Sequence, residues 1–398
     1  MLTDAKIDSL RNDTPGCAER SHFNHAGASL PPRRVTEAIV GHLMLESTRG
    51  PMEAAALVAD ELAMLRTNAA KFIGADEGEV AFGGSGSALW GSVFAALPQL
   101  RSGERILIGR QEWGGNVASM QRAASHAGAS IETIPCTEDG SVDPNALSAM
   151  IDDKVRMISL TWLPANGGLI NDAEAIGRVA NAARIPYFVD AGQALGQLPI
   201  DVSRIGCDVL KAAGRKYVRG PRGTALLYVR SKFLEKLNPR FVDVSSGPLV
   251  NGKVELRKDA RLFETSEAPI SLLLGLGEAI ALASELGVEA IQVRIALLAT
   301  QLREGLKRIP AVEVRDLGEK QSGLVSFTVE GISASVVRSK LAEKSISIGA
   351  NGVPYTPFDM TARGLQEIAR ASVSYFNTAG EVDGLVHAVE QIAKDVIQ

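Results

Sequence analysis

Short apolar segments alternate with segments of helical spacing through the middle of the chain. The short segments, which are typical of β-strands, cover residues 105–109, 130–136, 155–162, 185–191 and 224–230. Between them, residues 116–129 and 172–185 have the periodicity of helices; Asp172 is placed to cap the second, and Glu174 lies in its first turn. This alternation predicts an α/β fold with a mainly parallel sheet flanked by helices, and ligands at the carboxyl ends of its strands.

The pattern changes near residues 265–270, where long amphipathic helical segments begin. These run over residues 270–309 and stop at Pro310, and short strand-like pieces follow at 312–316 and 323–329. A further helical segment lies near residues 333–345. The sequence therefore predicts a second, smaller α+β unit at the C-terminal end.

Composition and charge favour a small-molecule ligand. The chain has 398 residues, 45% of them hydrophobic and 22% charged, and a net charge of −4 without blocks of like charge. Nothing here favours nucleic acid or a membrane surface, and no signal or spanning segment is visible. The odd set Cys17, Cys136 and Cys207 favours a reducing, cytoplasmic location. The five histidines are scattered; His22 and His25 form the one close pair, so no metal site is expected.

Two residues that follow strand-like segments are candidates for chemistry. Asp190 ends the segment IPYFVDAGQ, three residues before Gln193, and Lys216 lies in DVLKAAGRKYVRGPRG between two apolar segments. A lone carboxylate there could cap a helix, bind a metal or pair with a buried cation, and most lysines are solvated. Together, however, a lysine that forms a Schiff base and an aspartate that binds a pyridinium nitrogen are what pyridoxal 5'-phosphate (PLP) enzymes need.

The stretch 188–230 resembles the cofactor signature of class V aminotransferase-fold PLP enzymes. This group holds cysteine desulfurases, isopenicillin N epimerase and the carbon-sulfur lyases of ergothioneine formation, and the chain looks nearest to the last two. Further matches are FNHAGASLPP, QEWGGN, PANGGLIND, FETSE and RASVSYFNTAGEVDGL. The resemblance implies a PLP-dependent transferase fold of type I and a homodimer. It also implies an N-terminal segment 1–25 that packs with the small domain, a large PLP-binding domain 26–268 and a small domain 269–398.

The resemblance also implies a role for each matching residue. Lys216 would form the Schiff base and move the proton at the substrate α-carbon, while Asp190 would bind the ring nitrogen. The remaining cofactor residues would be Gln193 at the phenolic oxygen, Trp113 stacked on the ring, and Gly86, Ser87 and Arg215 at the phosphate. Arg370 would grip the substrate α-carboxylate, and the other substrate contacts would be Asn166, Asn24 and His25.

The cysteines limit which reaction of the group is expected. Persulfide-forming desulfurases need a cysteine in a mobile loop before the final arginine, and no cysteine lies beyond Cys207. The expectation is therefore a lyase that eliminates a group from the β- or γ-carbon of an amino acid. An aminotransferase or an epimerase or racemase of the same fold is the alternative, and a non-catalytic PLP-fold binding protein is a further one.

Overall fold

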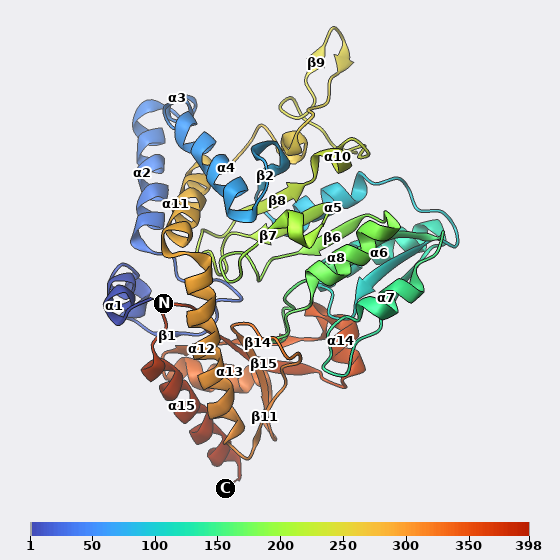
Figure 1. The fold of residues 1–398 in the computed structure, drawn as a ribbon. Helices are drawn as coiled ribbons and strands as arrows, with labels where there is room; N and C mark the ends of the chain where they lie inside the picture. The colour runs from blue at the N-terminus through green and yellow to red at the C-terminus, as the bar shows by residue number, and fades with distance from the viewer. Residues whose placement is uncertain (1, 398) are drawn as a thin grey trace.

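A mixed β-sheet lies at the centre of the larger part of the protein (Figure 1). In this computed structural model, which describes residues 2–397, the sheet has seven strands in the order β2-β8-β7-β6-β5-β3-β4. Strand β8 runs antiparallel to β2 and β7, whereas the other neighbours are parallel. The strands are β2 (Val80–Gly83), β3 (Arg105–Gly109), β4 (Ser130–Ile134), β5 (Val155–Thr161), β6 (Tyr187–Asp190), β7 (Val209–Ala213) and β8 (Ala225–Val229).

Helices cover the sheet and form one edge of the molecule. Helix α8 begins as predicted, because the Asp172 side chain accepts a hydrogen bond from the Ala175 backbone N–H at 2.9 Å. Helix α11 packs against α2 and α4, and Figure 1 shows these helices together. The helices before the C-terminal part are α1 (Asp4–Asn12), α2 (Arg33–Arg49), α3 (Pro51–Leu57), α4 (Ala59–Ile73), α5 (Gly86–Ala95), α6 (Gly114–Ala127), α7 (Pro144–Met150), α8 (Ala173–Ala183), α9 (Val202–Ile205), α10 (Ser231–Leu234) and α11 (Ile270–Leu286).

The sheet separates two hydrophobic cores, and this sets which way the polar residues of β6 and β7 point. Val189 and Leu210 belong to one core, while Phe188 and Val209 belong to the other. Successive strand residues face opposite sides, so Asp190 and Lys211 share the face of Phe188 and Val209. The register places Asp190 directly beside Lys211. Two charged side chains therefore enter one layer of an otherwise apolar sheet.

The C-terminal part is built around an antiparallel sheet of order β11-β12-β15-β14. Its elements are α12 (Val288–Lys307), β11 (Val312–Val314), β12 (Leu324–Val329), α13 (Ala334–Glu343), β13 (Ile346–Ser347), β14 (Gly349–Gly352), α14 (Pro357–Ala362), β15 (Glu367–Ser372) and α15 (Ala379–Ile397). The predicted strands and helices after residue 270 are thus confirmed, with α11 and α12 separated at Gly287, whose φ is +77°.

The N-terminal segment lies against this C-terminal part. Strand β1 (Ser21–His22) pairs in parallel with β13, and Asn24 forms a bridge with Ser372. The domain boundaries expected after residues 25 and 268 stay predictions. The hairpin of β9 (Leu249–Val250) and β10 (Lys253–Val254) projects from the larger part (Figure 1). Within residues 2–397, no single helix is long and apolar enough to cross a membrane. Helices α11 and α12, which meet at an angle of 81°, would together be long and apolar enough, but by length and composition only.

Candidate functional site

The structure brings Asp190 and Lys216 together at the carboxyl ends of two neighbouring strands. Asp190 is the last residue of β6, and Lys216 follows the end of β7 by three residues. A β-carbon placed on Gly192 would lie 2.9 Å from Asp190 Oδ1 and 3.5 Å from Lys216 Nζ, so both atoms border one small gap. The Gly192 backbone N–H also donates to Asp190 Oδ1 at 2.9 Å. A glycine is needed here because any side chain would fill the gap.

Lys216 lies in surroundings that favour its neutral amine. Burial lowers the pKa of Lys216 to about 7, although the charge of Asp190 acts in the opposite direction. Three further cations, Lys211, Arg215 and Arg370, contribute to the lowering. A lysine that is neutral near pH 7 can attack an aldehyde and can accept a proton, as the predicted role requires.

Asp190 is held by three donors. Lys211 Nζ lies 2.7 Å from Oδ2, and Asn116 Nδ2 donates to the same oxygen at 3.1 Å. The Gly192 backbone N–H donates to Oδ1. Lys211 was not among the residues predicted from the sequence. A signal was present, since Lys211 is the one charged residue of VLKAA in β7 and shares the face of Asp190 across the sheet.

A second buried carboxylate, Glu112, lies behind Asp190. Asn116 Nδ2 donates to Glu112 Oε1 at 2.8 Å as well as to Asp190, so one amide joins the two acids. Thr161 Oγ1 donates to Glu112 Oε1 at 2.7 Å, and Ser159 Oγ donates to Oε2 at 3.0 Å. Burial raises the pKa of Glu112, and the negative charge of Asp190 raises it further. Within QEWGGN, the sequence pattern indicated Trp113 and gave no sign of this network.

The predicted ring-stacking and phosphate residues border the same region. Trp113 caps helix α6 and is half-buried, with its ring centroid 5.5 Å from that of Tyr355. Gly86 begins helix α5, where an added β-carbon would lie 3.3 Å from Lys211 Cδ. Ser87 is exposed in the first turn of that helix. The roles of Trp113, Gly86 and Ser87 stay predictions.

Two predicted cofactor residues carry buried polar atoms that have no partner among residues 2–397. These atoms are Gln193 Oε1 and Arg215 Nε. The Gln193 amide N–H donates to Ala26 O at 3.1 Å. Burial lowers the pKa of Arg215, and the nearby Arg222 lowers it further. Buried groups left without partners carry a cost unless another group satisfies them, so both atoms are suited to a polar ligand.

Arg370 is buried in β15 and reaches the loops around the candidate site. Its Nη1 donates to Ala165 O at 2.7 Å and its Nη2 to Asn24 Oδ1 at 3.3 Å, while Nε has no partner among the described residues. Burial lowers the pKa of Arg370 to about 10. Asn166 follows Ala165 directly and donates to Gly352 O at 3.1 Å. Asn24 and the segment of Ala165 and Asn166 therefore both lie near Arg370, and the contacts of Asn24 and Asn166 with substrate stay predictions.

His25 occupies different surroundings from the other predicted substrate residues. Its Nδ1 lies 2.8 Å from Ser29 Oγ and its Nε2 lies 3.1 Å from Asn377 Oδ1. The ring is buried and packs edge-on against Phe376. Both ring nitrogens thus have partners within the protein, and the contact of His25 with substrate stays a prediction.

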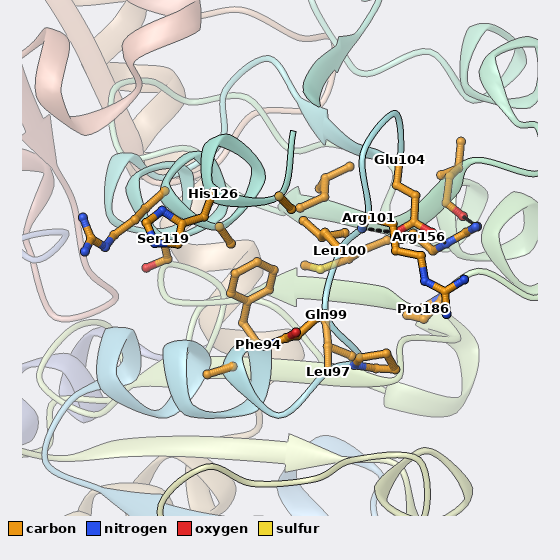
Figure 2. Close-up of a pocket in the computed structure, with 18 of the residues that line it drawn as sticks. Phe94, Leu97, Gln99, Leu100, Arg101, Glu104, Ser119, His126, Arg156 and Pro186 are labelled. Carbon is orange, nitrogen blue, oxygen red and sulfur yellow. Dashed lines mark hydrogen bonds and ion pairs between the residues drawn. The ribbon is translucent and has the colours of Figure 1, made fainter. Parts of the chain in front are cut away.

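A separate cavity of about 1000 Å³ lies at the opposite ends of the strands (Figure 2). Its walls include Phe94, Leu97 and Arg101, and the Arg156 guanidinium pairs with Glu104 at 2.7 Å. The lining residues come from the starts of β3 and β5, from helices α5 and α6, and from the loops that precede β3 and β6, together with Arg240. None of the predicted site residues lines this cavity, so it is separate from the candidate site.

Comparisons with known proteins define the class of this chain. The sequence pattern of the family Aminotransferase class-V matches residues 22–385. A cysteine desulfurase from Haloferax volcanii is 27% identical over 380 residues, covering 93% of this chain and 88% of that protein. The apo structure of a cysteine desulfurase from Thermococcus onnurineus superposes with a TM-score of 0.91 at 24% identity, covering 98% of each chain.

A solved lyase structure is also similar. The complex of the cystine C–S lyase C-DES with its reaction product cysteine persulfide has a TM-score of 0.85 at 24% identity, covering 95% of this chain and 99% of that one. The chain belongs to the class V aminotransferase family of PLP-dependent enzymes. Its fold is the predicted α/β fold of type I, with a mostly parallel seven-stranded sheet and a C-terminal antiparallel sheet within residues 2–397.

The residues present fit PLP, the cofactor of this family. The cations Lys211, Arg215 and Arg370 all act on Lys216, and a phosphate would bring negative charge to this group. The unpartnered Arg215 Nε and Gln193 Oε1 offer a donor and an acceptor. Asp190 would hold the ring nitrogen, and Lys216 would bond to the aldehyde carbon.

We predict that Lys216 becomes reactive toward acetic anhydride at unusually low pH in the PLP-free protein. Its amine is protonated below about pH 7 and neutral above it, so half-maximal labelling is expected near pH 7 rather than near its ordinary value of 10.5. Peptide mass spectrometry would follow Lys216, with the exposed Lys232 as a reference for reagent loss. A midpoint in the ordinary lysine range would contradict the assigned surroundings.

Proposed function

We propose that this enzyme is a PLP-dependent lyase that eliminates a group from the β- or γ-carbon of an amino acid. The observation that carries the proposal is Lys216, whose amine borders the same gap at Gly192 as Asp190 and has a pKa of about 7. The nearest type in our proposal is the isopenicillin N epimerase and ergothioneine carbon-sulfur lyase group. The similarity to a cystine C–S lyase supports a substrate with sulfur on its side chain.

The reaction needs a base at the substrate α-carbon and a residue that binds the substrate α-carboxylate. When bound, PLP supplies a pyridine ring that draws electrons from the α-carbon of a covalently attached amino acid. Lys216 Nζ takes the α-proton, and the electron pair of that bond forms the Cα=Cβ double bond as the sulfur departs with the Cβ–S pair. Lys216 returns the proton to the leaving thiolate, and water hydrolyses the product to an α-keto acid and ammonia.

Arg370 has the geometry to orient the substrate for this step. Its guanidinium is buried, and the unpartnered Nε adds a donor to those that contact Ala165 and Asn24. A guanidinium binds a carboxylate through two parallel hydrogen bonds and so fixes the direction of the α-C–H bond. Arg370 therefore serves binding and orientation, while Lys216 moves the proton.

The cysteines of this chain do not suit a desulfurase that forms a persulfide. Burial raises the pKa of Cys17 and Cys136, and it raises that of the fully buried Cys207 further. A thiol acts as a nucleophile in its thiolate form, so a raised pKa disfavours this role. The segment from β14 to α14, which contacts the Trp113 region through Tyr355 and Pro354, contains no cysteine.

A panel of amino acids incubated with the holoenzyme tests the proposed reaction. We expect cysteine, cystine or a related thioether to release an α-keto acid, ammonia and a sulfur compound in equal amounts, with catalytic turnover. Coupled keto-acid assays and thiol titration measure these products, and Lys216→Ala is the matched inactive control. Accumulation of pyridoxamine phosphate would instead indicate an aminotransferase, and loss of optical activity without keto acid would indicate a racemase. Either result would overturn the lyase proposal.

Arg370→Ala should weaken substrate binding without disturbing the cofactor. Losing a charge-assisted pair of hydrogen bonds should raise KM by about 10- to 100-fold. The visible absorbance of bound PLP should remain unchanged, because the proposed cofactor contacts lie on other residues. Arg370→Lys keeps the charge but loses the paired hydrogen bonds, so its KM should lie between those of the wild type and Arg370→Ala. Loss of PLP from Arg370→Ala would show that Arg370 belongs to the cofactor site.

We also propose that the enzyme is a homodimer that uses the face of α2, α3 and α4. Apolar side chains at this face are exposed, which is unusual for a surface without a partner. They are Val40, Leu43, Met44, Met52, Leu57 and Met64. Sedimentation should give twice the 42.1 kDa of one chain, and Met52→Glu should shift the equilibrium toward monomer. Val293→Glu, on the exposed surface of α12, is the control. A single-chain mass at every loading concentration would contradict the dimer.

A further inference from the structure

Lys211 is the buried cation whose place the proposed reaction does not explain. It lies in β7 between β6 and β8, with 6% of its surface exposed. Its Nζ approaches Asp190 Oδ2 at 2.7 Å, and its Cδ lies close to Gly86 at the start of α5. The side chain therefore runs from the expected phosphate end of the site to the acid that would hold the ring nitrogen.

Asp190 has little acceptor capacity left once its partners are counted. A carboxylate offers about two acceptor positions on each oxygen. Lys211 and Asn116 occupy Oδ2, and the Gly192 N–H occupies one position on Oδ1. Among the described residues, one position on Oδ1 thus remains for a ring N–H. That oxygen is also the one that borders the gap shared with Lys216.

We propose that Lys211 is a positioning residue that shares the negative charge of Asp190, so that the ring nitrogen of bound PLP holds its proton less tightly than on an unshared carboxylate. Two cations then compete for one anion in a site with little water, where such competition is strong. This inference rests on the proposed function and deepens it, because it concerns the choice among reactions at the same site.

The other charged groups around Asp190 do not cancel this effect. Lys216 faces it across the gap at Gly192, and Arg215 and Arg370 add positive charge around Lys216. Glu112, which reaches Asp190 through Asn116, accepts from four donors, but burial and the charge of Asp190 raise its pKa and so disfavour a second negative charge there. Lys211 is the cation in direct contact with the carboxylate.

A weakly protonated ring favours elimination over transamination. Such a ring stabilises the electron pair left at the α-carbon less well. Elimination passes this pair directly to a leaving group, so its rate should fall less than the rate of a reaction that holds the pair in the ring. Transamination needs storage, because a proton must reach the cofactor carbon before the pair moves on. Lys211 is in this way a determinant of reaction specificity.

The test compares the wild-type holoenzyme with Lys211→Met, which keeps the length of the side chain and removes the charge. With PLP labelled by ¹⁵N in the ring, the nitrogen chemical shift reports its protonation directly. We expect Lys211→Met to move the shift toward the protonated value, while Lys232→Met, which removes an exposed charge, leaves it unchanged. Equal shifts in wild type and Lys211→Met would overturn the proposal. Lys211→Gln serves as the second neutral variant if Lys211→Met does not fold.

A cofactor analogue separates this role from a merely structural one. In deaza-PLP a C–H group replaces the ring nitrogen, so Asp190 gains nothing from binding it. Titrations followed by protein fluorescence give the Kd of PLP and of deaza-PLP for each protein. The preference for PLP, which is the Kd of deaza-PLP divided by the Kd of PLP, should be about tenfold larger in Lys211→Met than in the wild type. An equal change for both compounds would show that Lys211 acts through packing or through the phosphate, and would overturn the proposal.

The reaction products connect the inference to the proposed function. With an amino acid that the wild type cleaves, Lys211→Met should increase the pyridoxamine phosphate formed per keto acid released, and an unchanged ratio would overturn the specificity role. If no amino acid is cleaved by the wild type, the proposed lyase function fails. The ¹⁵N shift still decides the role of Lys211 in that case, because it needs the bound cofactor and no substrate.

Discussion

The burial of several cations around one carboxylate, Asp190, sets the chemistry of the site. A buried charge is costly unless it is paired, and Asp190 is in direct contact with Lys211. The remaining lysine responds differently, since burial together with the neighbouring cations drives Lys216 toward its neutral form. Burial is the larger cause of the lowered pKa of Lys216, and the neighbouring cations add to it. The same cations would favour an anionic ligand in this pocket.

The sheet makes this arrangement possible because it fixes the register of β6 and β7. Asp190 and Lys211 are direct neighbours on one face, and the backbone turn after each strand brings Gly192 and Lys216 to the same edge. Behind them, Asn116 joins Asp190 to Glu112, whose carboxylate is held by hydroxyl groups of β5. A carboxylate held by several donors keeps its orientation, which a site for a planar ring requires.

The fold and the central pair were predictable from the sequence, whereas the charge network was not. Strand periodicity placed Asp190 at a strand end, and the resemblance around Lys216 added its role. Lys211 and Glu112 were not predicted, because the stretch around Lys211 was interpreted only as an apolar segment before Lys216 and the stretch around Glu112 was interpreted through Trp113. Their importance depends on which strands are neighbours and on the register between them, and a single sequence does not specify either. His25 shows the converse, since proximity in sequence to Asn24 did not bring it to the same partners.

Arg370 is linked to the N-terminal segment through Asn24. The arginine lies in β15, the Asn24 side chain accepts a hydrogen bond from its Nη2, and Asn24 itself bridges to Ser372 two residues further along. These contacts join the N-terminal segment to the C-terminal sheet. Arg370 Nη1 also donates to Ala165 O in the loop after β5, so one guanidinium connects three segments that lie far apart in the sequence. A displacement of the N-terminal segment would therefore act directly on the residue proposed to bind the substrate carboxylate.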